Sequence, residues 1–125
     1  MAKREFYDKG DIVFVEEFEY ISGEKGINHY FVIIDVDGDD VEIVPLAYLG
    51  MLISSKTEKN KDVNAKFPYN EPIEPSIDTG LTRQGHVKTD EILTIKAKHI
   101  AKKIGSVTIE QYETYLKMFL KAKSE

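Results

Sequence analysis

The sequence YFVIIDVDGDDVEIVPL, residues 30–46, contains two runs of β-branched and aromatic side chains separated by a short acidic segment with one glycine. Such side chains fit the pleated surface of a strand. An Asp-Gly pair between two such runs favours a tight turn, because glycine takes a positive φ without steric cost. The stretch therefore predicts a β-hairpin with strands at Tyr30–Val36 and Val41–Leu46, joined by residues 37–40.

Further β-rich segments lie on both sides of this hairpin. Asp11–Glu17 (DIVFVEE) follows Gly10 and predicts a first strand, and Leu49–Ser54 extends the sheet. Phe18–Asn28 contains two glycines and charges of both signs without helical periodicity, so it predicts a mobile loop. Loops of this kind often carry functional residues.

Residues 55–80 are polar and contain Pro68, Pro72 and Pro75. Proline has no backbone N–H to donate to a sheet ladder, which excludes a central strand there. We expect a long surface connection with a short strand at Val63–Phe67, followed by renewed β character over Leu81–Ile95.

Two helices are predicted towards the end of the sequence. Apolar residues recur at helical spacing before Gly105, which stands where helices commonly end: Ala97, Ile100, Ala101 and Ile104. They predict one short helix. Thr108 and Gln111 then match a capping box, and an apolar stripe follows, made of Ile109, Tyr112, Leu116, Phe119 and Leu120. This second helix should pack on the sheet.

The composition limits the class of protein. A chain of 125 residues with 42% hydrophobic side chains has the size of one domain, so we expect residues 1–125 to form a single unit. It has no cysteine, no apolar run of the roughly 20 residues that a membrane-spanning helix needs, and no signal peptide. We therefore expect a cytoplasmic, mainly β protein with α structure, built as a compact antiparallel sheet or small barrel with a terminal helix.

Several short motifs resemble, in their order and spacing, the MazF/PemK family of toxin endoribonucleases. They cover most of the chain and lie at residues 9–13 (KGDIV), 26–34 (GINHYFVII), 44–46 (VPL), 78–81 (DTGL), 85–95 (GHVKTDEILTI) and 103–105 (KIG). The resemblance implies a small SH3-like antiparallel β-barrel, usually a homodimer, that cleaves single-stranded RNA. It also implies a reaction without metal or cofactor, and silencing by a cognate antitoxin.

The nature of the antitoxin stays open. The family resemblance implies a protein, but Pro45 and Leu46 followed by Ser54, Ser55 and Lys56 also resemble toxins of the same broad fold that RNA antidotes silence. Separately, the aspartates of residues 37–40 suggest a calcium loop. The glycine at position 6, the glutamate at position 12 and the flanking helices of an EF-hand are missing, so we predict no metal site.

The chain departs from the family where catalysis is expected. The family's Arg-Pro at the start of the second strand is replaced by His29 and Tyr30, and the threonine at the end of the third strand by Ala47. A basic residue and an acid two positions apart are retained as Lys88 and Asp90. Residues i and i+2 of a strand project from the same face, so the pair is sterically reasonable.

Metal-free RNA cleavage needs a base for the 2′-hydroxyl proton, a positive charge near the phosphorane and an acid for the leaving 5′-oxygen. His29 is the natural acid or base, since an ordinary histidine pKa lies near ~6.5. Asp90 is its candidate partner and Lys88 the candidate for phosphate. Ser54, or Ser55, is a candidate replacement for the threonine hydroxyl.

RNA contacts are predicted from scattered basic residues, because a local basic face can bind nucleic acid even when the net charge is −5. The candidates are Lys56, Lys59, Lys61, Arg83 and His86. Simpler interpretations remain open for each candidate: His29 and His86 as surface histidines, Lys88 and Asp90 as an exposed ion pair, and the lysines as a soluble loop.

The departures from the family support a second functional hypothesis. A protein of this fold that lacks the arginine and the threonine can act without catalysis, by binding a partner protein or RNA, as topoisomerase-poisoning relatives do. Cleavage of RNA by the purified protein separates the two hypotheses.

Overall fold

The computed structural model describes residues 6–37, 45–54 and 69–124. They form seven strands, one short 3-10 turn and one α-helix. The strands are β1 (Asp11–Glu19), β2 (Lys25–Val36), β3 (Ala47–Ser54), β4 (Asn70–Ile73), β5 (Gly85–Lys88), β6 (Leu93–Lys96) and β7 (Ile100–Ser106). The 3-10 turn η1 spans Ala97–His99, and the helix α2 spans Ile109–Ser124.

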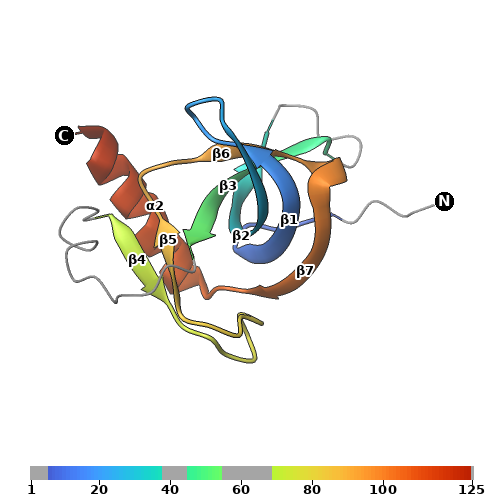
Figure 1. Ribbon diagram of the computed structural model, residues 1–125. Helices are drawn as coiled ribbons and strands as arrows, with labels where there is room; N and C mark the ends of the chain where they lie inside the picture. The colour runs from blue at the N-terminus through green and yellow to red at the C-terminus, as the bar shows by residue number, and fades with distance from the viewer. Residues whose placement is uncertain (1–5, 38–44, 55–68, 125) are drawn as a thin grey trace.

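All strand pairs are antiparallel, and the spatial order is β4-β5-β3-β2-β1-β7, with β6 pairing separately with β3. β5 pairs with the end of β3 and β6 pairs with its beginning, and β6 also contacts β1. The sheet therefore curls on itself into a small barrel, as Figure 1 shows. This is the mainly β architecture with a terminal helix that the sequence predicts.

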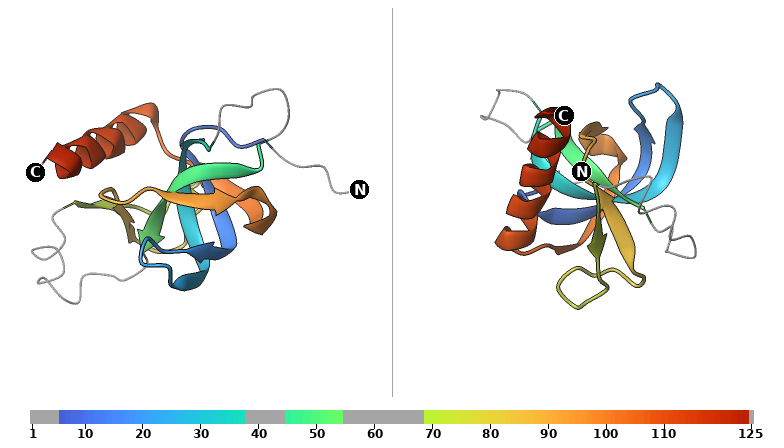
Figure 2. Two further views of the ribbon diagram at one scale, coloured as in Figure 1. Left: turned by 90° about the horizontal axis from the view of Figure 1, so that it is seen from above. Right: turned by 90° about the vertical axis from the view of Figure 1, so that its left-hand side faces the viewer.

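Two apolar clusters occupy the two faces of the curled sheet. One contains the residues that alternate inward on β1, β2, β3 and β6, among them Val13, Phe31 and Leu52. The other contains their strand neighbours Ile12, Val32 and others, and it is covered by α2. Figure 2 shows α2 lying against one side of the barrel, while the tip of the β1–β2 hairpin points away from the helix.

The capping box predicted for α2 is confirmed. The Gln111 backbone N–H donates to Thr108 Oγ1 over 3.1 Å, and the Thr108 N–H donates to Gln111 Oε1 over 2.9 Å. The predicted apolar stripe is only partly correct, because Ile109 and Leu120 are 68% and 66% exposed. Tyr115, outside that stripe, is instead the most deeply buried residue of the helix at 1% exposure.

The predicted mobile loop at residues 18–28 is wrong. Most of it forms paired strand, with Phe18 opposite Gly26, and only a short turn closes the hairpin. The turn is held by the Tyr20 N–H, which donates to the Glu24 carbonyl over 2.8 Å, and by Gly23 at a φ of 92°. The two glycines suggested disorder, but one serves this turn and the other makes room for the ring of Phe18.

The predicted short helix over residues 97–104 is also wrong. Only η1 is helical there, and Ile100–Ser106 form β7, the second neighbour of β1. The β1–β7 ladder has two register shifts, which disrupt the period-2 pattern by which a strand is recognised. Gly105 does not end a helix; a Cβ there would lie 2.3 Å from the carbonyl oxygens of Asp78 and Thr79.

The strand β2 pairs with an antiparallel strand that follows it in the sequence, but this strand is a later segment than the predicted Val41–Leu46. Val36 lies opposite Tyr48, so β3 begins at Ala47 and neither Pro45 nor Leu46 belongs to it. The predicted turn beyond Asp37, the strand residues 41–44 and the short strand at 63–67 lie outside the described residues. Leu81–Ile95 contains two short strands, β5 and β6, with a turn between them.

Candidate functional site

The sheet register brings three sequence candidates to one end of the central strands. Tyr30 on β2 pairs with Ile53 on β3, so His29 and Ser54 are the next residues at the same end of that ladder. Ser54 in turn pairs with His86 on β5. Residues that face each other in an antiparallel pair have Cα atoms about 4.5–5.5 Å apart and side chains on one face. An imidazole, a hydroxyl and a second imidazole therefore form a row across β2, β3 and β5.

His29 is half-buried, and its orientation is fixed by two contacts. Its Nδ1 lies 2.8 Å from the Ile27 carbonyl oxygen, and its ring meets the Phe18 ring edge-on with centroids 5.4 Å apart. Because a carbonyl only accepts, Nδ1 is the donor in this contact, and the contact does not engage Nε2. The preceding residue, Asn28, has a φ of 51° within the strand, a conformation that asparagine tolerates better than most residues.

Ser54 occupies the place that the family resemblance assigns to a threonine. We expected that place, the end of the third strand, at Ala47. In the structure Ala47 begins β3 and Ser54 ends it, so the assignment to Ala47 is wrong. The error follows from the early start predicted for this strand. A hydroxyl therefore stands where the sequence analysis inferred that one was missing.

Lys88 and Asp90 do not share a strand face as predicted, because β5 ends at Lys88. Asp90 lies in the following turn, beside Thr89, which is fully buried and donates its hydroxyl and its N–H to the Tyr69 carbonyl. This anchored turn holds Asp90 next to the end of β5. Both Lys88 and Asp90 are partly exposed, but they lie at and beyond the end of β5 that is further from Ser54, since Ser54 pairs with His86 and Ile53 with Val87.

The RNA-binding candidates separate into three groups. His86 is 4% exposed, so the simpler interpretation of a passive surface histidine is wrong, and its reach towards solvent RNA is small. Arg83 is exposed just before β5. Lys56, Lys59 and Lys61, and with them Ser55, lie outside the described residues.

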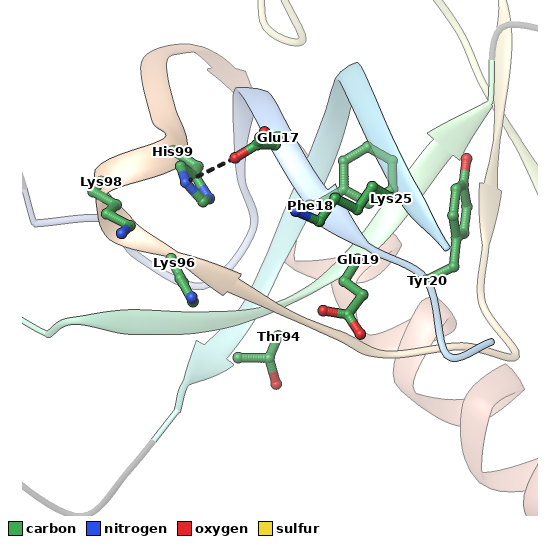
Figure 3. Close-up of a pocket in the computed structure, with 9 residues that line it drawn as sticks. All are labelled: Glu17, Phe18, Glu19, Tyr20, Lys25, Thr94, Lys96, Lys98 and His99. Atoms are coloured by element: carbon green, nitrogen blue, oxygen red, sulfur yellow. Dashed lines mark ion pairs between the residues drawn. The ribbon is translucent and has the colours of Figure 1, made fainter. Parts of the chain in front are cut away.

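A pocket that the sequence analysis missed opens beside Phe18. It has a volume of about 550 Å³ and lies between the β1–β2 hairpin and the β6–η1 segment (Figure 3). Its lining consists of Glu17, Phe18, Glu19, Tyr20, Lys25, Thr94, Lys96, Lys98 and His99. The sequence did carry a signal, since FEY and KAKH alternate charged and apolar residues, but the first was interpreted as loop and the second as helix.

A polar contact across the pocket ties η1 to β1, because Glu17 Oε2 and His99 Nε2 are 3.3 Å apart. Within the described ranges, no three histidine, aspartate or glutamate side chains gather in a way that could hold a metal ion. No helix in the part of the chain that the structure describes is long and apolar enough to cross a bilayer.

Comparison with known proteins gives concordant results. Residues 8–120 match the family described as PemK-like, MazF-like toxin of type II toxin-antitoxin system. Comparison with curated protein sequences gives no match. The solved structures that share the fold include the following three, all at low sequence identity. The Mycobacterium tuberculosis toxin MazF-mt6 has a TM-score of 0.61 at 13% identity, covering 91% of this chain and 96% of that one.

The other two are described as an endoribonuclease from mycobacterial species and an endoribonuclease in complex with its cognate antitoxin from mycobacterial species. Their TM-scores are 0.62 and 0.60, at 14% and 15% identity. Each similarity covers 98% of this chain, with 93% and 96% of the respective relative. From the match over residues 8–120, which is nearly the whole sequence, the chain belongs to the PemK-like, MazF-like toxin family of type II toxin–antitoxin systems.

Proposed function

We propose that this protein is a toxin that cleaves single-stranded RNA without a metal ion or other cofactor, at His29 on β2 and the neighbouring residues of β3 and β5. The observation that carries the proposal is the row formed by His29 and Ser54, with Lys88 two residues beyond His86 on β5 and Asp90 in the turn that follows. An RNA strand that runs from His29 across β3 to the turn after β5 would meet proton transfer, a hydroxyl and a positive charge, which are the groups that the reaction requires.

In the proposed reaction the Asp90 carboxylate takes the proton from the ribose 2′-hydroxyl. The 2′-oxygen then bonds to phosphorus while the bond from phosphorus to the 5′-oxygen breaks. Protonated His29 gives its Nε2 proton to that leaving oxygen, and the products are a 2′,3′-cyclic phosphate and a 5′-hydroxyl. The Nδ1 contact with the Ile27 carbonyl supports this role, because it keeps Nε2 directed away from the backbone.

Lys88 and Ser54 have supporting roles in the proposal. The Lys88 ammonium balances the charge that develops on the phosphorane, and the Ser54 hydroxyl donates to one of its oxygens. The His29 imidazole takes the place of the guanidinium that the family resemblance puts at the start of the second strand, although β2 itself begins at Lys25. The site therefore combines acid catalysis with weaker fixed charge, and Lys88 supplies the cation from another strand.

The test is incubation of the purified protein with mixed-sequence single-stranded RNA in EDTA, followed by mapping of the ends. We expect cyclic phosphate ends, and a fall in rate of about 10²–10⁴-fold in His29→Ala and Asp90→Ala. Glu113→Ala, an exposed carboxylate on α2, is the matched control and should cleave normally. Intact RNA from the folded wild-type protein would contradict the proposal and favour a partner-binding toxin without catalysis.

A partner and a setting belong to the same proposal. One solved relative is an endoribonuclease in complex with its cognate antitoxin, which supports a cognate antitoxin here. We further propose that the chain is one domain, forms a homodimer and acts in the cytoplasm, where its RNA substrate is found. Light scattering coupled to gel filtration measures the oligomeric state, and co-expression with the neighbouring reading frame tests whether the antitoxin is a protein.

A further inference from the structure

The pocket beside Phe18 has a size and composition that suit a ligand. Its volume of about 550 Å³ lies within the range of about 300–1,000 Å³ usual for small-molecule sites. In Figure 3, Lys96 and Lys98 stand on one side, Tyr20 on the opposite side, and the Glu19 carboxylate between them. Aromatic, cationic and anionic groups thus converge on one space.

The charges of the pocket are of both signs and are only partly neutralised within it. Glu17 is engaged by His99 at 3.3 Å. Glu19 forms no ion pair with any residue that the structure describes, although Lys25 is its cross-strand partner on β2. A carboxylate acceptor is therefore available beside several ammonium donors.

An aromatic wall connects this pocket to the proposed catalytic histidine. The rings of Phe18 and Tyr20 meet edge-on with centroids 5.0 Å apart, and both line the pocket. On its other side Phe18 meets His29 at 5.4 Å. The ring of Phe18 therefore lies between the pocket, which it lines, and His29, which it contacts.

These features match a nucleotide, and the carboxylate selects among the bases. Tyrosine offers a face on which bases stack, and lysines bind phosphate. Guanine presents two adjacent N–H donors, N1–H and N2–H₂, to a carboxylate, while its O6 and N7 accept from lysine. Adenine and cytosine would direct a ring-nitrogen lone pair at the carboxylate, and uracil offers one N–H between two carbonyls.

We propose that this pocket binds a guanine nucleotide of the RNA substrate beside the phosphate at His29. Glu19 accepts from the N1–H and N2–H₂ donors, Lys96 or Lys98 donates to O6 or to a neighbouring phosphate, and Tyr20 stacks on the base. The link to cleavage rests on the function proposed above, whereas guanine binding itself does not. The pocket thereby sets the sequence preference of the toxin.

The test measures binding of 2′-O-methyl RNA hexamers, which cannot be cleaved, by fluorescence anisotropy. The hexamers carry one guanine, adenine or hypoxanthine within a uridine background. We expect the guanine hexamer to bind about tenfold more tightly than the adenine one, and hypoxanthine, which lacks the N2 amino group, to lose much of that advantage. Glu19→Gln should abolish the preference for guanine.

Glu16→Gln is the matched control, because Glu16 is an exposed glutamate of the same strand outside the pocket. It should retain the preference. Both side chains are exposed, so neither variant should impair folding. Equal affinity for guanine and adenine in the wild-type protein, or a preference that survives Glu19→Gln, would overturn the proposal.

Two further measurements separate related outcomes. Guanosine monophosphate should compete only at much higher concentration than the hexamer, and equal competition would assign the pocket to a free nucleotide and overturn the substrate role. Cleavage of ordinary RNA is measured in parallel. Guanine-selective binding without cleavage would refute the proposed function and leave the pocket standing. Cleavage without any preference for guanine would refute the pocket and leave the function standing.

Discussion

Replacing Gly26 with alanine tests how firmly Phe18 is held beside His29. An alanine Cβ at this position would lie 2.2 Å from Cζ of Phe18, well inside the contact distance of two carbons. The ring has little room to move, because it is 5% exposed and packs edge-on against Tyr20, His29 and Phe31. The clash must therefore be relieved by displacing the ring or by separating the two strands.

The expected cost follows from this packing. Inserting a methyl group into a filled core site typically destabilises a protein by about 1–3 kcal/mol. We expect Gly26→Ala to lower the free energy of unfolding by that amount. If His29 shifts with the ring, RNA cleavage should fall by up to about 10²-fold, since a displacement of roughly 1 Å in a reacting group can have that effect.

Urea denaturation measures the stability, and RNA cleavage is measured under conditions where the variant is fully folded. Phe18→Leu in the Gly26→Ala background provides the control, because a smaller side chain leaves room for the new methyl group. The double variant should be more stable than the sum of the single changes predicts by more than about 0.5 kcal/mol. Additive effects, or a Gly26→Ala variant with wild-type stability and activity, would refute the reasoning.

Two neighbouring tyrosines of α2 should respond oppositely to loss of their hydroxyls. The Tyr112 hydroxyl donates to the Ile34 carbonyl over 2.6 Å, so Tyr112→Phe should cost about 1–3 kcal/mol in urea denaturation. The buried Tyr115 hydroxyl has no hydrogen-bond partner among the described residues, so Tyr115→Phe should leave stability unchanged or raise it by about 1 kcal/mol; a clear loss would reveal a partner. Burial raises the pKa of Tyr115 to about 12. The Tyr115 hydroxyl therefore loses its proton at a lower pH in the unfolded chain than in the folded protein. The free energy of unfolding that this difference contributes is lost as the pH rises from about 10 to about 12. In Tyr115→Phe that part of the decline should be absent.

The parts of the fold that local patterns determine could be predicted from the sequence. The first strand and the capped C-terminal helix depend on neighbouring residues, and both are confirmed. The strand β2 has an antiparallel partner, but this partner is Ala47–Ser54 and not the predicted Val41–Leu46. The strand β7 could not be recognised, because its bulged pairing with β1 hides its periodicity. The β1–β2 hairpin was missed for a related reason: Gly26 is required by a ring eight residues away, which no local rule anticipates.

The candidate site was predictable only residue by residue. His29 and Ser54 were selected by residue type and family position, but their place in one row depends on the β2–β3 register. The expected alignment of Lys88 with Asp90 failed because Thr89 is buried and turns the chain. The pocket beside Phe18 was missed entirely, since it needs β1, β2, β6 and η1 together and none of them contributes more than three residues.

The position of β1 between β2 and β7 has a consequence for how the protein is made. One edge of β1 pairs with β2, the strand that follows it, and the other with β7, which is synthesised much later. Tyr115, beyond that strand, then completes the cluster that contains Ile12. Pairings between residues far apart in sequence form slowly, because a long loop must close first. We therefore expect a nascent chain to complete the barrel only after both β7 and α2 have left the ribosome.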